Sequence, residues 1–288
     1  MREDAASPRG PGGDGGPHPL DNPARAALLG PHAHLAIRRG SVLRYPADVT
    51  PFIALPDEPD AETWRDAAAL LGPGALLPLA GFTGTPPPGW EALGHVPGVQ
   101  MVGDDVAARP DPEAVVLGPD DVADILALVA RTRPGPFLPR TIALGTYLGI
   151  RRGGELVAMA GERMHPPGWT EISAVCTDPA HRGEGLGTRL VHAVTALVRA
   201  RGETPFLHAT AANTTAIRLY EQLGFRLRRE VVFTALRVPG GDGTAPNPFA
   251  GLHGGDASRA DGARPVISPP RQPNSPTRAR GEEQGAGR

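Results

Sequence analysis

A short stretch between two predicted elements, RGEGLG (182–187), places one arginine and three alternating glycines together. The segment before it, TEISAVCT (170–177), is predicted to be a strand, and the residues after it repeat apolar side chains at helical spacing as far as residue 198. Glycine is a poor helix former, so helix stability does not explain three glycines where a helix begins. A strand, a glycine-rich turn and a helix N-terminus instead form an anion site, because free backbone N–H groups and the helix dipole favour negative charge.

Three kinds of phosphate-binding loop fit such an arrangement, and individual residues separate them. A Walker A loop needs a lysine, and the sequence contains none. The dinucleotide-binding fingerprint needs a third glycine, and Thr188 stands at that position. The pattern that remains is R-x-x-G-x-G, with Arg182, Gly185 and Gly187 at its fixed positions.

With this pattern, the stretch resembles the GNAT superfamily of acyl-CoA-dependent N-acyltransferases, whose members hold the coenzyme A pyrophosphate in such a loop. TEISAVCTDP (170–179) resembles the family's central strand, and NTTAIRLYEQLGFR (213–226) resembles its second signature. The resemblance covers about residues 109–239. It implies an α/β fold of the α+β kind, with a mixed, mostly antiparallel central sheet flanked by helices.

The resemblance also implies which residues contact acetyl-CoA. The backbone of Val175, Cys176 and Thr177 is expected to pair with the pantetheine arm. The pyrophosphate is expected at Arg182, Gly183, Glu184, Gly185, Leu186, Gly187 and Thr188. Asn213 is expected to contact the cofactor, and it is also a good N-cap for the helix that follows. Tyr220 matches the residue that protonates the departing thiolate, and its alternative role is a tyrosine of the hydrophobic core.

Acylation of an amine needs a neutral nucleophile, so a general base or a water chain is expected. Glu171 is the candidate base because it opens the predicted central strand, where the resemblance implies a basic carboxylate. The alternatives are a strand-end glutamate that faces solvent and one that is paired with an arginine such as Arg163. Glu162 and His165 are second choices. Strand alternation places Cys176 on the face opposite Glu171 unless a bulge resets the register. This placement favours direct attack in a ternary complex over a covalent acyl-enzyme on Cys176.

The sequence divides into four parts by composition and periodicity. Residues 1–20 and 240–288 are rich in glycine and proline and are predicted to be disordered tails. Residues 21–108 read as a small α/β region that walls the acceptor cleft, and a degenerate second copy of the GNAT fold is one interpretation of it. Residues 109–239 are the predicted catalytic domain.

Composition excludes several other functions. A net charge of −2 and the lack of a basic stripe argue against a nucleic-acid partner. No apolar run reaches the roughly 18–20 residues that a membrane helix needs, so we expect no membrane partner. The single cysteine excludes a cysteine-based zinc cluster and fits a reducing, cytoplasmic compartment.

The predicted protein is thus an acetyltransferase that uses acetyl-CoA and no metal. We expect it to act on an amine of a small molecule or peptide and to be a monomer or homodimer. The alternative is a non-catalytic domain that binds acyl-CoA as a sensor or scaffold.

Overall fold

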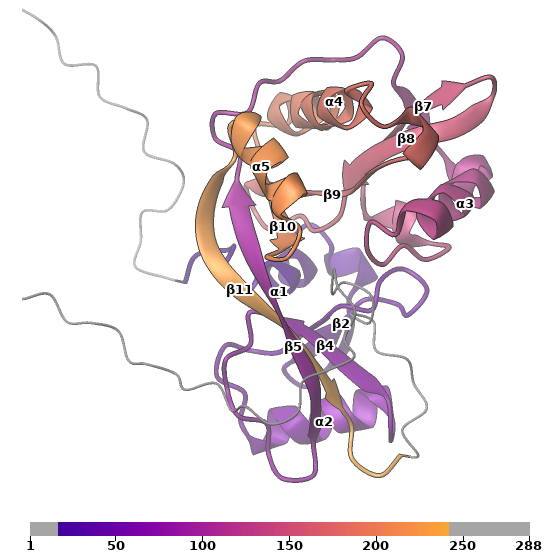
Figure 1. Ribbon diagram of the computed structural model, residues 1–288. Coiled ribbons are helices and arrows are strands. Elements are labelled where there is room, and N and C mark those ends of the chain that lie inside the picture. The colour runs from indigo at the N-terminus through magenta and orange to yellow at the C-terminus, as the bar shows by residue number, and fades with distance from the viewer. Residues whose placement is uncertain (1–16, 242–288) are drawn as a thin grey trace, which may run out of the picture. The chain divides into compact units, whose positions relative to one another are not determined.

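The computed structural model describes residues 17–241 (Figure 1). Nearly all of the two predicted disordered tails therefore lies outside the described residues. Ordered structure begins earlier than predicted, because Leu20 is fully buried and its carbonyl accepts a hydrogen bond from Gln100.

One mixed sheet of eight strands organises the fold, in the order β4-β11-β5-β10-β9-β8-β7-β6. Its strands are β4 (Leu76–Ala80), β5 (Glu91–Val102), β6 (Val115–Leu117), β7 (Tyr147–Arg152), β8 (Glu155–Glu162), β9 (Trp169–Thr177), β10 (Thr204–Thr210) and β11 (Arg226–Arg237). Only β9 and β10 run parallel, and every other neighbouring pair is antiparallel. The predicted fold class is confirmed.

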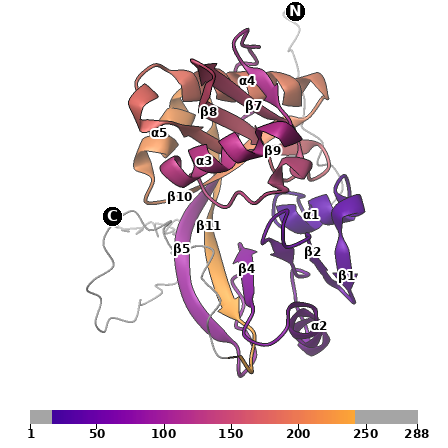
Figure 2. The same ribbon diagram turned by 90° about the vertical axis from the view of Figure 1, so that its right-hand side faces the viewer.

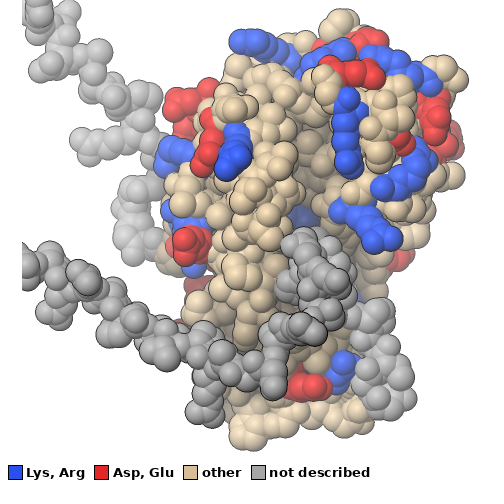
Figure 3. Space-filling model, in the orientation of Figure 1, with Lys and Arg blue, Asp and Glu red and all other residues tan. Residues whose placement is uncertain are grey.

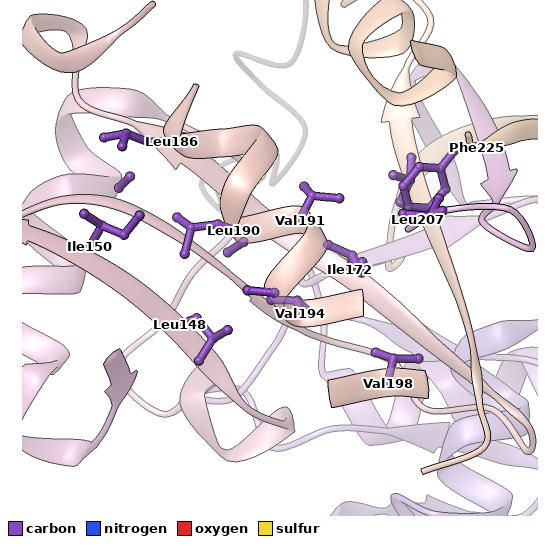
Figure 4. Close-up of a cluster of buried hydrophobic side chains, with 14 of the residues drawn as sticks. Leu148, Ile150, Ile172, Leu186, Leu190, Val191, Val194, Val198, Leu207 and Phe225 are labelled. Carbon is purple, nitrogen blue, oxygen red and sulfur yellow. The ribbon is translucent and has the colours of Figure 1, made fainter. Parts of the chain in front are cut away.

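Helices cover both faces of this sheet. They are α1 (Pro23–Leu29), α2 (Ala61–Leu71), α3 (Val122–Thr132), α4 (Leu186–Ala200) and α5 (Thr214–Gln222). The apolar stripe of α4 packs on one face of β7 and β9, where Leu190 and Val194 meet Ile150 and Ile172 (Figure 4). On the opposite face, Ile125 and Leu128 of α3 form a second core cluster with Tyr147 and Met159. These alternating contacts fix the position of β9 between two helices.

A smaller sheet and the ends of two long strands form the rest of the described chain. The smaller sheet contains β1 (Ile37–Arg39), β2 (Val42–Arg44) and β3 (Ile53–Ala54). Strands β5 and β11 extend together from the sheet beneath α4 towards β4 and α2 (Figure 2). Because β5 pairs with both β10 and β11, the main sheet continues across the expected boundary at residues 108 and 109. The division into a 21–108 region and a 109–239 domain stays a proposal.

Strands β9 and β10 separate shortly after they start. They pair only at three positions, the last being Glu171 opposite Phe206. Beyond that point β9 keeps its pairing with β8 on one side, and its other edge is not paired with β10. A bulge at Ala174, whose φ is +54°, marks the centre of this opening. The opening between two parallel strands is where the candidate site lies.

None of the helices within residues 17–241 is long and apolar enough to cross a membrane.

Candidate active site

A cavity of about 530 Å³ occupies the opening between β9 and β10. Its walls come from residues 172–177 of β9, residues 208–210 of β10, Tyr220 of α5, and the loop 132–136 after α3. In Figure 3 the surface is hollowed between α5 and α3, and basic side chains gather at the rim. The charged lining residues within the described chain are the arginines Arg133, Arg163 and Arg182. The cavity is therefore suited to negatively charged groups.

The predicted phosphate loop has the backbone geometry of an anion site. Gly183 and Gly185 have φ values of +86° and +73°, which favour glycine, and a Cβ at either position would meet no atom within 4 Å. Gly185 is the N-cap of α4 and offers no side-chain acceptor, so the first N–H groups of the helix have no capping partner in the described residues. Arg182 is exposed on the same loop and lines the cavity. These groups fit a pyrophosphate, and their contact with one remains a prediction.

Two further predicted cofactor contacts lie on the walls of the same cavity. Val175, Cys176 and Thr177 line it from β9, on the edge that β10 leaves unpaired. Asn213 lines it from the start of α5, where its Oδ1 accepts a hydrogen bond from the Ala216 N–H at 3.2 Å. The helix-capping role of Asn213 is thus confirmed, and its contact with the cofactor stays a prediction.

Tyr220 lies across the cavity from β9 and has its ring against Phe225, with the ring centroids 5.7 Å apart. Burial raises the pKa of Tyr220 to about 12. The phenol therefore stays protonated at neutral pH and is available as a donor. Its role as the acid stays a prediction, and the structure brings it to the same cavity as the loop and β9.

Glu171 differs from what we expected of a base. Its side chain is fully buried and lies beneath the cavity wall. Arg163 donates to its two oxygens from Nε at 2.8 Å and from Nη2 at 2.5 Å, and His208 donates from Nδ1 at 2.7 Å. Burial alone would raise the pKa of Glu171, but the charge and hydrogen bonds of Arg163 and His208 outweigh it and lower that pKa to about 2. These surroundings match one of the two alternatives, the ion pair with Arg163, and contradict the other, a side chain that faces solvent.

The second-choice bases lie away from the cavity. Glu162 is buried and accepts hydrogen bonds from Arg201 at 2.8 Å and from the Thr146 N–H at 3.0 Å. His165 lies 3.6 Å from Glu162 and stacks near His32, with the ring centroids 4.9 Å apart. Neither residue lines the cavity, so the structure does not bring them to the predicted reaction centre.

The predicted orientation of Cys176 is wrong because of the bulge at Ala174. Cys176 is paired with Met159 and Ser173 with Gly161, so two residues of β9 lie opposite the single residue between them on β8. This extra residue reverses the alternation, and Cys176 shares a face with Ser173 and Glu171. The Cys176 side chain packs against the α3 core cluster, and burial raises the pKa of its thiol to about 11.

The lining residues that the sequence does not single out include Phe52, His208 and, as a cavity residue, Arg163. His208 carries a recognisable signal, because it is a polar residue within the strand segment TPFLHAT (204–210) next to the expected site. Its Nε2 accepts a hydrogen bond from the Gln100 side chain at 3.1 Å, which fixes the ring. Phe52 carries no comparable signal, because the tertiary fold alone brings it over Arg163.

The described part of the chain, residues 17–241, contains no group of three or more His, Cys, Asp or Glu residues that could hold a metal ion.

Comparisons with known proteins give relatives with acetyltransferase names. The FR47-like protein family matches residues 147–234. The N-alpha-acetyltransferase RimI of Mycobacterium tuberculosis is 38% identical over 102 residues, which are 33% of this chain and 61% of that protein. The mycothiol acetyltransferase of Thermobispora bispora is 48% identical over 56 residues, 19% of each protein. The chain thus spans less than two thirds of the length of these curated relatives.

A solved structure gives a more complete match. A protein from Novosphingobium aromaticivorans that is assigned to the GNAT family is 41% identical in sequence, with a TM-score of 0.71. The match covers 78% of this chain and 100% of that chain. It therefore includes parts of this chain outside the region that the FR47-like family matches.

Proposed function

Because this chain belongs to the GNAT family of acetyltransferases, we propose that it transfers an acetyl group from acetyl-CoA to the amine of a small molecule or peptide. One observation carries the proposal. The cavity between β9 and β10 is lined by Arg182 of the glycine-rich loop before α4, by the unpaired edge of β9 and by Tyr220, which burial keeps protonated. An acyl-CoA thioester needs these three kinds of group at its pyrophosphate, its amide-containing arm and its leaving sulfur.

Each part of the cavity would perform one task. The loop at 182–188 would hold the pyrophosphate through its N–H groups and the dipole of α4. The free edge of β9 from Val175 to Thr177 would hold the pantetheine amides. The amine would then attack the carbonyl carbon, forming the C–N bond as the C–S bond breaks, and Tyr220 would give its proton to the sulfur. The phenolate would recover a proton from the acetylated nitrogen through water.

We assign Glu171 a positioning role in this scheme. Its carboxylate is ionised and already receives three hydrogen bonds, so it has little capacity to take a proton from an amine. Glu171 instead fixes the guanidinium of Arg163 at the cavity wall. The positive lining favours the neutral form of a bound amine over its ammonium form, which also reduces the need for a strong base.

Release of coenzyme A from acetyl-CoA tests the proposal directly. The full chain is mixed with acetyl-CoA and a panel of amines, and the free thiol is followed with a thiol-reactive dye. We expect release above the background hydrolysis for at least one amine, with the matching acetylated product seen by mass spectrometry. Binding of acetyl-CoA without turnover of any amine would overturn catalysis and favour a sensor.

A further inference from the structure

The guanidinium of Arg163 is only half used by the protein. Its Nε and Nη2 atoms donate to Glu171, which occupies one edge of the planar group. The ring of Phe52 lies over its face, 4.9 Å from the central carbon. A guanidinium has five N–H groups, so the edge formed by Nη1 and the second N–H of Nη2 is left over.

This second edge is open to the cavity. Nη1 has no hydrogen-bond acceptor among residues 17–241. It is also not one of the fully buried polar atoms without a partner there, which belong to His165, Trp169 and Thr195, so Nη1 is accessible. Arg163 lines the cavity, and 13% of its side chain is exposed. Two parallel N–H groups at the end of a fixed guanidinium match the two oxygens of a carboxylate.

The charge around the open edge also favours an anion. The other charged lining residues of the described cavity are Arg133 and Arg182, and no Asp or Glu lines it. Glu171 neutralises Arg163 from beneath, but its carboxylate is fully buried on the far edge of the guanidinium. An incoming carboxylate would therefore meet N–H donors before it meets the negative charge.

We propose that Arg163 binds a carboxylate of the acceptor, so that the preferred acceptor is an amino acid or a similar small molecule with both an amine and a carboxylate. The inference rests on the proposed acetyl transfer, because it concerns the acceptor at the same site. Arg163 lies at the wall where β9 and β10 separate, so a carboxylate held there keeps the amine of a small molecule near the reacting thioester.

The first test compares amino acids with their decarboxylated amines. Phenylalanine is paired with phenethylamine, methionine with 3-methylthiopropylamine, and histidine with histamine, and kcat/KM is expressed per neutral amine. We expect the amino acid to exceed its partner by about 10- to 100-fold in at least one pair, the range for a bidentate, charge-assisted contact. Turnover of amines without this preference in any pair would overturn the inference and leave acetyl transfer intact. Failure of every amine would overturn both.

The second test changes the open edge and keeps the charge. Arg163→Lys retains a cation beside Glu171 but removes the second edge of the guanidinium. We expect the ratio of kcat/KM for the amino acid over its decarboxylated amine to fall about 10-fold or more. Arg201→Lys is the matched control, since Arg201 also pairs with a buried glutamate, Glu162, and lies outside the cavity lining. Its ratio should equal that of the wild type, and an equal loss in both variants would contradict a specific role for Arg163. If Arg163→Lys does not fold, the wild-type ratios of kcat/KM for amino acid over amine decide whether the site prefers a carboxylate.

Discussion

The ion pair between Arg163 and Glu171 makes a quantitative prediction about stability. Glu171→Gln keeps the shape of the side chain and removes its charge. The wild-type pKa of Glu171 is lowered from 4.5 to about 2 by Arg163 and His208, after burial has opposed them. A difference of this size between folded and unfolded chains corresponds to about 3 kcal/mol in favour of the ionised folded state. We expect Glu171→Gln to lower the free energy of unfolding by about this amount at pH 7, because Arg163 then lacks a counter-charge.

The same lowered pKa fixes the pH dependence. A carboxylate with a lower pKa in the folded state contributes stability above its unfolded pKa and loses it as the pH falls through the folded value. The difference between wild type and Glu171→Gln should thus be constant above about pH 5 and shrink steadily below pH 4.5 towards pH 2. Urea unfolding followed by the fluorescence of the three tryptophans measures this difference at each pH.

A double-mutant cycle separates the ion pair from other effects. Arg163→Met leaves Glu171 buried with only His208, and we expect it to cost about 3–5 kcal/mol. The double variant Arg163→Met/Glu171→Gln should cost clearly less than the sum of the two single variants, because no unpaired charge remains. Asp66→Asn is the matched surface control, since its partner Arg39 is exposed and such pairs contribute about 0–1 kcal/mol. Additive costs, or a Glu171→Gln variant as stable as the wild type, would refute the reasoning.

The other predictions concern acetyl-CoA and the chemical step. Gly185→Glu should abolish acetyl-CoA binding in calorimetry, because this position has a positive φ and a glutamate there would repel the pyrophosphate. Gly187→Ala should fold normally, since its Cβ would lie 3.8 Å from the nearest neighbouring atom. Unchanged affinity in Gly185→Glu would remove the phosphate-loop proposal. Tyr220→Phe should lower kcat by about 100-fold or more and leave acetyl-CoA affinity unchanged, and wild-type turnover would exclude its role as the acid. Cys176→Ala should keep kcat close to the wild-type value, and complete loss of turnover with an intact fold would instead indicate an acyl-enzyme.

The elements that carry the proposed cofactor end of the site could be predicted, because they are adjacent in sequence. Strand β9, the glycine loop and α4 follow one another, so local patterns of alternation, turn formation and helical spacing define them. The expected helix after the glycines is α4, which begins at Leu186. The helix with Asn213 and Tyr220 is likewise α5, with Asn213 as its cap. Here each local preference agrees with the tertiary fold.

The proposed acceptor end could not be predicted, because its side chains meet only through the order of the strands in the sheet. Phe52 precedes β3, Arg163 follows β8 and His208 lies on β10, and no local pattern connects them. Strand β5 shows the same limit. Gly94, Pro97 and Gly98 lie within this strand, and residues of these types argue against a long strand. Pairing with β11 overrides these preferences, and Pro97 lies just beyond the segment that pairs with β10, where the missing N–H costs least.

The bulge at Ala174 also bears on the choice between direct attack by the amine and a covalent acyl-enzyme on Cys176. Ala174 adopts a φ of +54° although it is not glycine, so the sequence has no glycine there to predict the break in alternation. The extra residue turns Cys176 towards the core cluster beneath α3, while the edge of β9 that faces the cavity stays free of β10. A covalent route needs a thiolate at the cavity, and burial opposes one by raising the pKa of Cys176 to about 11. Cys176 thus lies on the face opposite to the one that simple alternation predicts, and its burial still supports the proposed direct attack over an acyl-enzyme. We therefore keep the incoming amine, and not the cysteine, as the proposed nucleophile.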